Sequence, residues 1–157
     1  ETIQRMFLKA YNQMMGNRDG VIEDCQIMRT TLRDCAKLDA DIAKWQEEIE
    51  VVAELVKKYV QDNASCAQSQ DEYSKRYENL AKRYEKAVAK HEVLTGERTG
   101  RAARDNELHL FIEALRTQPL VLETWDERLW ITLVEKGTVH TDGGVAFEFK
   151  NGTIIKV

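Results

Sequence analysis

The sequence predicts a mainly α-helical protein in which a long antiparallel two-helix coiled-coil arm stands on a small helical base, with a C-terminal three-stranded antiparallel β-meander. Two heptad patterns flank a short polar stretch in the middle of the chain. The last twenty residues change to short β-runs separated by Asp-Gly and Asn-Gly. A single Pro among 157 residues, 32% of them charged, is also typical of long helices.

The two heptad patterns predict the seam of the arm. In each pattern, mostly apolar residues recur at steps of three and four, as in a coiled coil. If the chain folds back between them, paired residue numbers sum to 132 or 133, and the largest side chain, Trp45, faces the smallest, Ala87, as interdigitating packing requires. The seam comprises Leu38, Ile42, Trp45, Ile49, Val52, Val56, Tyr59, Tyr73, Tyr77, Leu80, Tyr84, Ala87, His91 and Leu94.

The stretch NASCAQSQDEY, residues 63–73, is predicted to contain the turn of this hairpin, with the tip near 63–70. Ser69 and Glu72 have the S-x-x-E spacing of a capping box, so the second helix should begin near Gln70. If that helix runs to Gly96, its length is about 35–40 Å at 1.5 Å per residue.

Beyond Gly96 the heptad positions become charged, and Gly96 and Gly100 each lower helix stability by ~1 kcal/mol relative to Ala. On the opposing helix, the heptad spacing of the apolar residues is lost at the same distance from the turn, where Asp39 is a candidate N-cap. We therefore expect the arm, residues 37–96, to end at a hinge. The hinge and a returning base helix would occupy 97–118.

The base is predicted from amphipathic patterns on both sides of the arm. Residues 1–36 contain two helices separated by Gly16-Asn17, and Leu108, Phe111, Ile112 and Leu115 give the returning helix an apolar face. Residues 119–157 contain a short helix that begins with a T-x-x-E capping box at Thr124, followed by the runs TVH, VAFEF and TIIKV. The Asp-Gly and Asn-Gly turns between these runs indicate β-hairpins. Gly137 should weaken the first strand or make room for a bulge.

The cysteines and histidines give no strong chemical signal. Cys25, Cys35 and Cys66 lack the C-x-x-C spacing of a zinc site, and Cys25 and Cys35 are read as reduced, packed thiols. His91 is read as a seam residue rather than a metal ligand, since neither a second His nor a Cys lies nearby in its helix. No acidic or histidine pair has the spacing of an acid/base site. We expect no catalytic residue, cofactor or metal site in this chain.

Charge and hydropathy limit the partners. The net charge of −4 argues against nucleic-acid binding over the whole surface but leaves room for a local basic patch. No apolar run approaches the roughly 20 residues of a membrane span, and the chain starts without a signal-peptide pattern. It also starts without Met, so we expect a piece of a larger protein.

Four segments together resemble the C-terminal region of large serine recombinases, the family that moves prophages and conjugative transposons. The segments are MFLKAYNQMMGNRDGVIEDC, EIEVVAELVKKYVQDNAS, QDEYSKRYENLAKRYEKA and ETWDERLWITLVEKGTVHTDGGVAFEFKNGT. The most specific motifs are D-E-Y-x-x-R-Y from Asp71 and D-x-x-L-W-x-x-L-V-E-K from Asp126. The resemblance covers essentially the whole chain, although the glycines in GERTGRAARD replace what is more often a continuous charged helix.

The resemblance implies a non-catalytic part of a site-specific DNA recombinase, with the nucleophilic serine and a zinc ribbon upstream. The arm of such a protein contacts the arm of another DNA-bound subunit and controls synapsis and directionality, with a directionality factor as a further candidate partner. The base would lie near the duplex DNA of the attachment sites, in the cytoplasm of a bacterium that carries the mobile element. The implied tip contacts are Asn63, Ser65, Cys66, Gln68 and Ser69. Candidate DNA contacts are Arg98, Arg101, Arg104, Lys136, His140 and Lys150.

Two other interpretations remain open. The arm could be a general protein-interaction device unrelated to recombination, or the chain could be an enzyme, which its residue spacing does not favour. For Arg98, Arg101 and Arg104, an ordinary solvated face is an equal alternative to phosphate contact.

Overall fold

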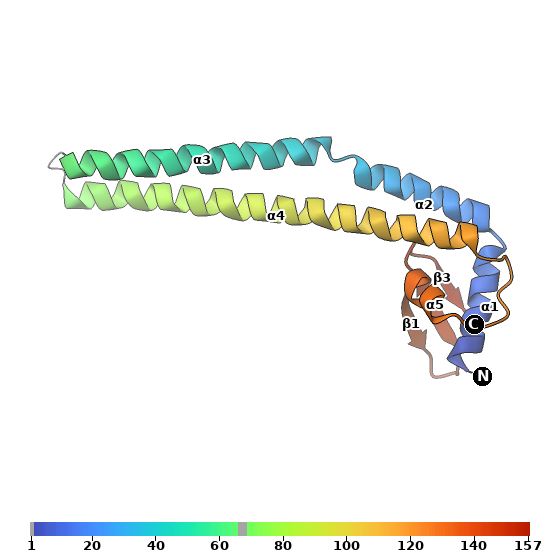
Figure 1. The fold of residues 1–157 in the computed structure, drawn as a ribbon. Coiled ribbons are helices and arrows are strands. Elements are labelled where there is room, and N and C mark those ends of the chain that lie inside the picture. Colours follow the sequence, from blue (N-terminus) through green and yellow to red (C-terminus); the bar gives the residue numbers. More distant parts are fainter. Residues whose placement is uncertain (1, 66–68) are drawn as a thin grey trace. The chain divides into compact units, whose positions relative to one another are not determined.

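The structure, a computed structural model, describes residues 2–65 and 69–157 and is mainly helical, with a three-stranded antiparallel sheet at the C-terminal end, as the sequence predicts (Figure 1). The chain divides into two compact units. We call Glu1–Arg33 with Ala102–Val157 the mixed unit, and Asp34–Arg101 the helical pair. The elements are α1 (Ile3–Met15), α2 (Arg18–Arg33), α3 (Ala36–Ser65), α4 (Gln70–Thr117), α5 (Glu127–Leu133), β1 (Val134–Val139), β2 (Val145–Phe149) and β3 (Ile154–Lys156).

The mixed unit contains a continuous hydrophobic core. Phe7 of α1 lies at its centre, fully buried, with its ring 5.4 Å from Trp125, 5.2 Å from Trp130 and 6.2 Å from Phe147 between centroids. These edge-on contacts are the geometry that aromatic rings prefer. The apolar face predicted for the returning helix is also buried here, and its residues are Leu108, Phe111, Ile112 and Leu115.

The loop between α4 and α5 is attached to α1 by polar side chains. The Tyr11 hydroxyl donates to the Pro119 carbonyl at 2.9 Å, and burial raises the pKa of this phenol. The Asn12 amide donates to the Leu122 carbonyl and accepts from the Leu122 N–H. These bonds satisfy backbone groups that a helix or sheet would otherwise pair.

The N-cap predicted at Thr124 is wrong, because helix α5 begins three residues later. Asp126 is the N-cap, and its carboxylate accepts from the N–H groups of Arg128 and Leu129. Asp and Thr are both good N-cap residues, and Asp126 lies inside the T-x-x-E pattern, so the sequence offered two candidate caps. Leu129, Leu133 and Val134 are buried, and Trp130 packs against the same core.

The sheet has the order β1-β2-β3, with both neighbouring pairs antiparallel. The two predicted turns place Gly143 and Gly152 at positive φ, which Gly adopts without steric cost. Strand β1 starts at Val134, four residues before the predicted Thr138, because Val134 already pairs with Phe149. A bulge follows at Glu135, where the register shifts, and Gly137 lies opposite Phe147.

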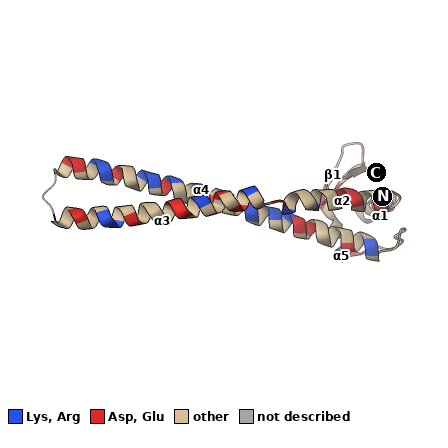
Figure 2. Ribbon diagram, turned by 90° about the horizontal axis from the view of Figure 1, so that it is seen from above, with Lys and Arg blue, Asp and Glu red and all other residues tan. Residues whose placement is uncertain are grey.

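The helical pair consists of α3 and the first part of α4, running antiparallel. The Tyr59 and Tyr73 rings stack with centroids 5.1 Å apart, and Arg83 donates to Glu48 at 2.9 Å. Near the start of α3, the Arg98 guanidinium donates to Asp39 at 2.8 Å. Basic and acidic residues are interspersed along both helices (Figure 2).

The second helix does not end at Gly96 as predicted, and residues 97–104 are helical within α4. Gly96 and Gly100 do not have the positive φ of a helix-terminating Gly, and an added Cβ at either position would meet nothing within 4 Å. An i,i+4 ion pair between Glu97 and Arg101 spans the region. The glycine penalty of ~1 kcal/mol each is too small to break a helix whose later turns are buried in a core.

The predicted cap at Asp39 is also wrong. Helix α3 begins at Ala36, and the Asp39 N–H donates to the Cys35 carbonyl at 2.8 Å. Asp39 therefore lies in the first turn, where its charge complements the helix dipole. Its side chain accepts from Arg98 instead of capping the helix.

Candidate interaction surfaces

The predicted tip residues lie around the end of α3 and the start of α4. Ser65 is the last residue of α3, Asn63 is half-buried, and Ser69 is exposed just before α4. The Ser69 carbonyl accepts from the Tyr73 N–H at 3.0 Å, consistent with the predicted helix start. Cys66 and Gln68 lie outside the described residues.

The predicted seam follows the less exposed side of both helices. Val52 and Ala87 are fully buried, and Leu38 is nearly so. Tyr77 and Tyr84 depart from this pattern, with 42% and 39% of their surface exposed. The other seam positions, His91 among them, are half-buried. Two helices offer each seam residue only one opposing helix, so its flanks stay exposed to water.

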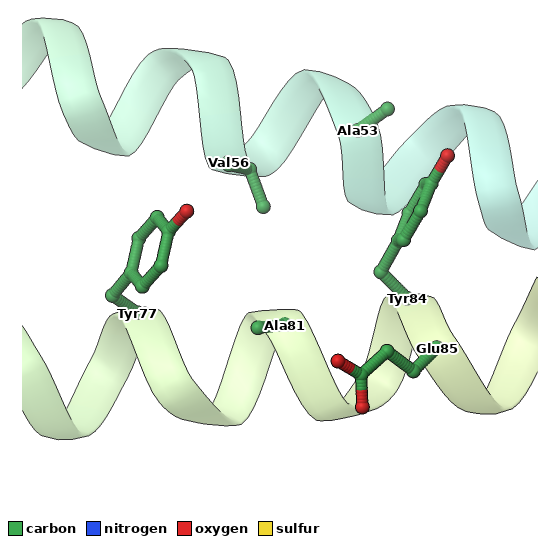
Figure 3. A pocket seen from close by; sticks show the side chains of 6 residues that line it. All are labelled: Ala53, Val56, Tyr77, Ala81, Tyr84 and Glu85. Atoms are coloured by element: carbon green, nitrogen blue, oxygen red, sulfur yellow. The ribbon is translucent and has the colours of Figure 1, made fainter.

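The two exposed tyrosines border a groove of about 310 Å³ on one flank of the helical pair (Figure 3). Their rings rise from α4 toward α3, on either side of Val56. The small side chains Ala53 and Ala81 leave the space between them open. Sequence reasoning missed this groove, although alanines next to seam tyrosines were a signal for it. The lining is Ala53, Val56, Tyr77, Ala81, Tyr84 and Glu85.

The arginines proposed as DNA contacts all have acidic partners within their own unit. In the helical pair, Arg98 binds Asp39, which raises the pKa of Arg98, and Arg101 binds Glu97 and the Asp34 carbonyl. In the mixed unit, the Arg104 guanidinium lies 3.0 Å from Glu107. All three arginine side chains are also partly exposed, at 42%, 34% and 39%, so the solvated face and the phosphate contact both stay predictions.

The sheet candidates lie on or near the exposed face of the hairpin. Lys136 is exposed and directly opposite Glu148 in the register, a cross-strand pair of opposite charges. His140 is exposed at the end of β1, where its N–H donates to the Gly144 carbonyl. Lys150 is half-buried and follows β2 directly. All three belong to the mixed unit, whereas Arg98 and Arg101 belong to the helical pair.

One charged cluster was missed by sequence reasoning, between α2 and α4 in the mixed unit. Asp105 accepts from Arg29 at 2.7 Å and from Arg33 at 3.0 Å, and Arg29 also lies 3.3 Å from His109 Nδ1. Hydrogen bonding to Arg29, and then to Arg33, lowers the pKa of Asp105 despite its partial burial. The only sequence signal was the i,i+4 spacing within each helix, which does not reveal that the two helices meet.

Cys25 and Cys35 are both buried. Cys25 is fully buried in the core of the mixed unit, and burial raises the pKa of its thiol. Cys35 is 3% exposed. Across residues 2–65 and 69–157, no group of three His, Cys, Asp or Glu side chains could hold a metal ion.

Comparison of the chain with protein-family models, curated proteins and solved structures finds no match. No helix in the described part of the chain is both long and apolar enough to cross a membrane.

Proposed function

We propose that this chain is a non-catalytic part of a site-specific DNA recombinase of the large serine family. In this proposal the helical pair is a coiled-coil arm that contacts the arm of another DNA-bound subunit, and the mixed unit lies near duplex DNA. The enzyme's active site and a zinc ribbon belong to parts outside this sequence. The working compartment would be the cytoplasm.

The supporting observation is the poor burial of the helical pair. Of its described residues, only Cys35, Leu38, Val52 and Ala87 are buried, and several large apolar side chains are exposed. Contiguous exposed apolar surface is typical of proteins that bind a partner, and Val51 and Leu55, one turn apart on α3, line one groove. A contact of modest area per subunit suffices when both arms are held on the same DNA, because the effective concentration is then high. The exposed residues are Val51, Leu55, Val60, Tyr77, Tyr84 and Val93.

The test is deletion of residues 40–93 from the complete recombinase, joined by a short turn. We expect DNA binding to persist while synapsis or directionality is lost, measured by recombination of paired attachment sites in both directions. As a narrower variant, substitution of residues 63–69 by Ser and Gly changes only the last three residues of α3 and none of α4, and should disturb synapsis alone. Normal directional recombination by the deletion variant would contradict the proposal.

A general protein-interaction arm is the second candidate, favoured by the groove beside Tyr77 and Tyr84. Aromatic side chains around a concave surface are common at protein interfaces. Ala81→Leu would fill the groove without touching the tip. If this change abolishes an interaction in a chain whose parent gene encodes no serine recombinase domain, the second candidate replaces the first.

A further inference from the structure

Helix α3 carries a second set of residues at heptad spacing, beside the seam that packs on α4. Each member immediately precedes a position of the seam's heptad pattern, so the set lies along one flank of the helical pair. Val51 and Leu55, in the middle of the set, are large and apolar but 45% and 40% exposed. We call the set the flank stripe, and its members are Lys44, Glu48, Val51, Leu55, Lys58 and Asp62.

The surface around the two apolar members is hollowed. One groove, of about 480 Å³, has Val51, Leu55 and Lys58 in its lining. A second groove, of about 450 Å³, also has Val51 in its lining and reaches Lys44. Because Val51 borders both grooves, they follow each other along α3 over about 20 Å, at 1.5 Å per residue. A concave apolar strip of this length suits a helix laid along it.

The charges of the flank stripe are arranged so that the stripe complements itself. If a second copy of α3 lies antiparallel on it, with a two-fold axis between Val51 and Leu55, the facing residue numbers sum to 106. Each charged member then faces an opposite charge, and the apolar members face each other. A two-fold axis is the symmetry in which one patch serves on both copies. The facing pairs are Val51 with Leu55, Glu48 with Lys58 and Lys44 with Asp62.

The opposite orientation does not fit. Two parallel copies in register would place Lys44, Glu48 and Lys58 each against a like charge, which is unfavourable. The antiparallel arrangement also accommodates the existing partner of Glu48, which accepts from Arg83 of its own arm at 2.9 Å and keeps 28% of its side chain exposed. A carboxylate accepts several hydrogen bonds, so Lys58 of the second copy can join this pair.

Glu54 marks the position of the axis. It lies beside Leu55, close to the level of the axis, so the Glu54 side chains of two antiparallel copies approach each other. Lys57 lies 3.8 Å from Glu54 and offsets part of their repulsion. A thiol in place of this carboxylate therefore removes an unfavourable contact and lies where the two copies are nearest.

We propose that the flank stripe is a docking surface for a second copy of this chain, which lies antiparallel on it around a two-fold axis between Val51 and Leu55. The contact uses about 20 Å of one helix from each copy, so free chains associate weakly, and a shared DNA raises their effective concentration. As the way in which two DNA-bound arms meet, the inference rests on the proposed function. It adds a contact on the flank of the arm to the one proposed at the tip.

The first experiment captures the contact by cross-linking the whole chain. Glu54→Cys in a Cys66→Ser background gives each copy one thiol near the axis, since Cys25 and Cys35 are buried. A short bismaleimide should convert this variant to a covalent dimer, seen by denaturing gel electrophoresis. The matched control is Glu78→Cys in the same background, which replaces an exposed glutamate on the other flank and should stay monomeric. Equal cross-linking of both variants, or none, overturns the proposal.

The second experiment exchanges the charges of one facing pair in the Glu54→Cys chain. Glu48→Lys alone and Lys58→Glu alone each place like charges opposite each other and should lower the yield of cross-linked dimer. An equal mixture of the two variants restores opposite charges and should restore the yield, which a merely structural role of either residue would not do. Lys75→Glu makes the same charge change on the exposed surface of α4 and should leave the yield unchanged. Circular dichroism checks that each variant keeps its helix content.

The outcomes separate this inference from the proposed function. Single variants that cross-link as well as their parent, or a mixture that fails to recover, would overturn the flank contact and leave the recombinase proposal standing. Charge-dependent cross-linking by a chain whose arm can be deleted without loss of directional recombination would keep the docking surface and contradict the proposed function.

Discussion

The mixed unit and the helical pair bury their side chains in different ways. In the mixed unit, three helical segments, a short helix and a sheet surround one core centred on Phe7, Phe111 and Phe147, each fully buried. In the helical pair, each helix has a single neighbour, so even seam residues such as Tyr84 stay more than a third exposed. Stability should therefore be concentrated in the mixed unit.

The largest effect should come from the core of the mixed unit. Leu108 is 1% exposed and Leu110, two residues along the same helix, is 52% exposed. Leu108→Ala should lower the free energy of unfolding by about 2–5 kcal/mol, through lost burial and a cavity. Leu110→Ala should change it by less than about 0.5 kcal/mol. Urea unfolding of both variants checks this, and equal losses would contradict the burial described here.

A second pair of variants asks whether the helical pair has any core. Val52 is fully buried and Val51 is 45% exposed. Val52→Ala should destabilise α3 by roughly 1 kcal/mol, because the lost burial of about 0.8 kcal/mol per CH₂ outweighs the better helix propensity of Ala. Val51→Ala should stabilise it by a few tenths of a kcal/mol. Hydrogen exchange of α3 amides should become faster in Val52→Ala and slower in Val51→Ala. A change in the same direction for both variants would show that α3 has no buried side.

The glycines offer a contrast of backbone conformation between the units. Gly96→Ala or Gly100→Ala should raise stability by up to about 1 kcal/mol each, since both are helical and have room for a Cβ. Gly152→Ala has equal room but a φ of +89°, so it should lower stability by about 1–2 kcal/mol. Thermal unfolding measures both. A loss of stability in Gly96→Ala would contradict the helical conformation at Gly96 and support the predicted hinge.

The smallest expected effect is on pH dependence. Arg29 and Arg33 lower the pKa of Asp105 in the folded chain below its ordinary value of 3.8. A lowered pKa adds stability above the ordinary value, which is lost as the pH falls through the folded value. Asp105→Asn should therefore flatten the acid side of the stability profile.

Glu48 in the helical pair provides the comparison for Asp105. Its pKa is also lowered, by hydrogen bonding to Arg83. Because the Glu48–Arg83 pair lies on an open helical surface, Glu48→Gln should have a weaker effect, which 1 M salt removes. Urea unfolding between pH 2 and 7, with and without salt, measures both variants. An equal salt response would mean that Asp105 is no better shielded than Glu48.

The predictions from sequence were strongest where the chain signals its structure locally. Asp142-Gly143 and Asn151-Gly152 indicated two turns, and both glycines have positive φ. The start of α4 at Gln70 was also predicted from a local capping pattern. Three predicted helix ends were wrong. The helix-lowering effect of Gly96 was weak, and the capping signals at Thr124 and Asp39 each competed with another interaction nearby. At Gly96, α4 continues because its later turns are buried. At Thr124, Asp126 caps α5 instead. At Asp39, the side chain binds Arg98 rather than capping α3.

By itself, the sequence determined the helices and the turns of the sheet, because heptad spacing and Asn-Gly or Asp-Gly dipeptides act within a few residues. Only the tertiary structure decided which side chains meet. The Arg29–Asp105 pair joins residues 76 positions apart, and the groove at Tyr77 depends on small residues of two helices. Such contacts depend on how helices pack, and no local pattern specifies them.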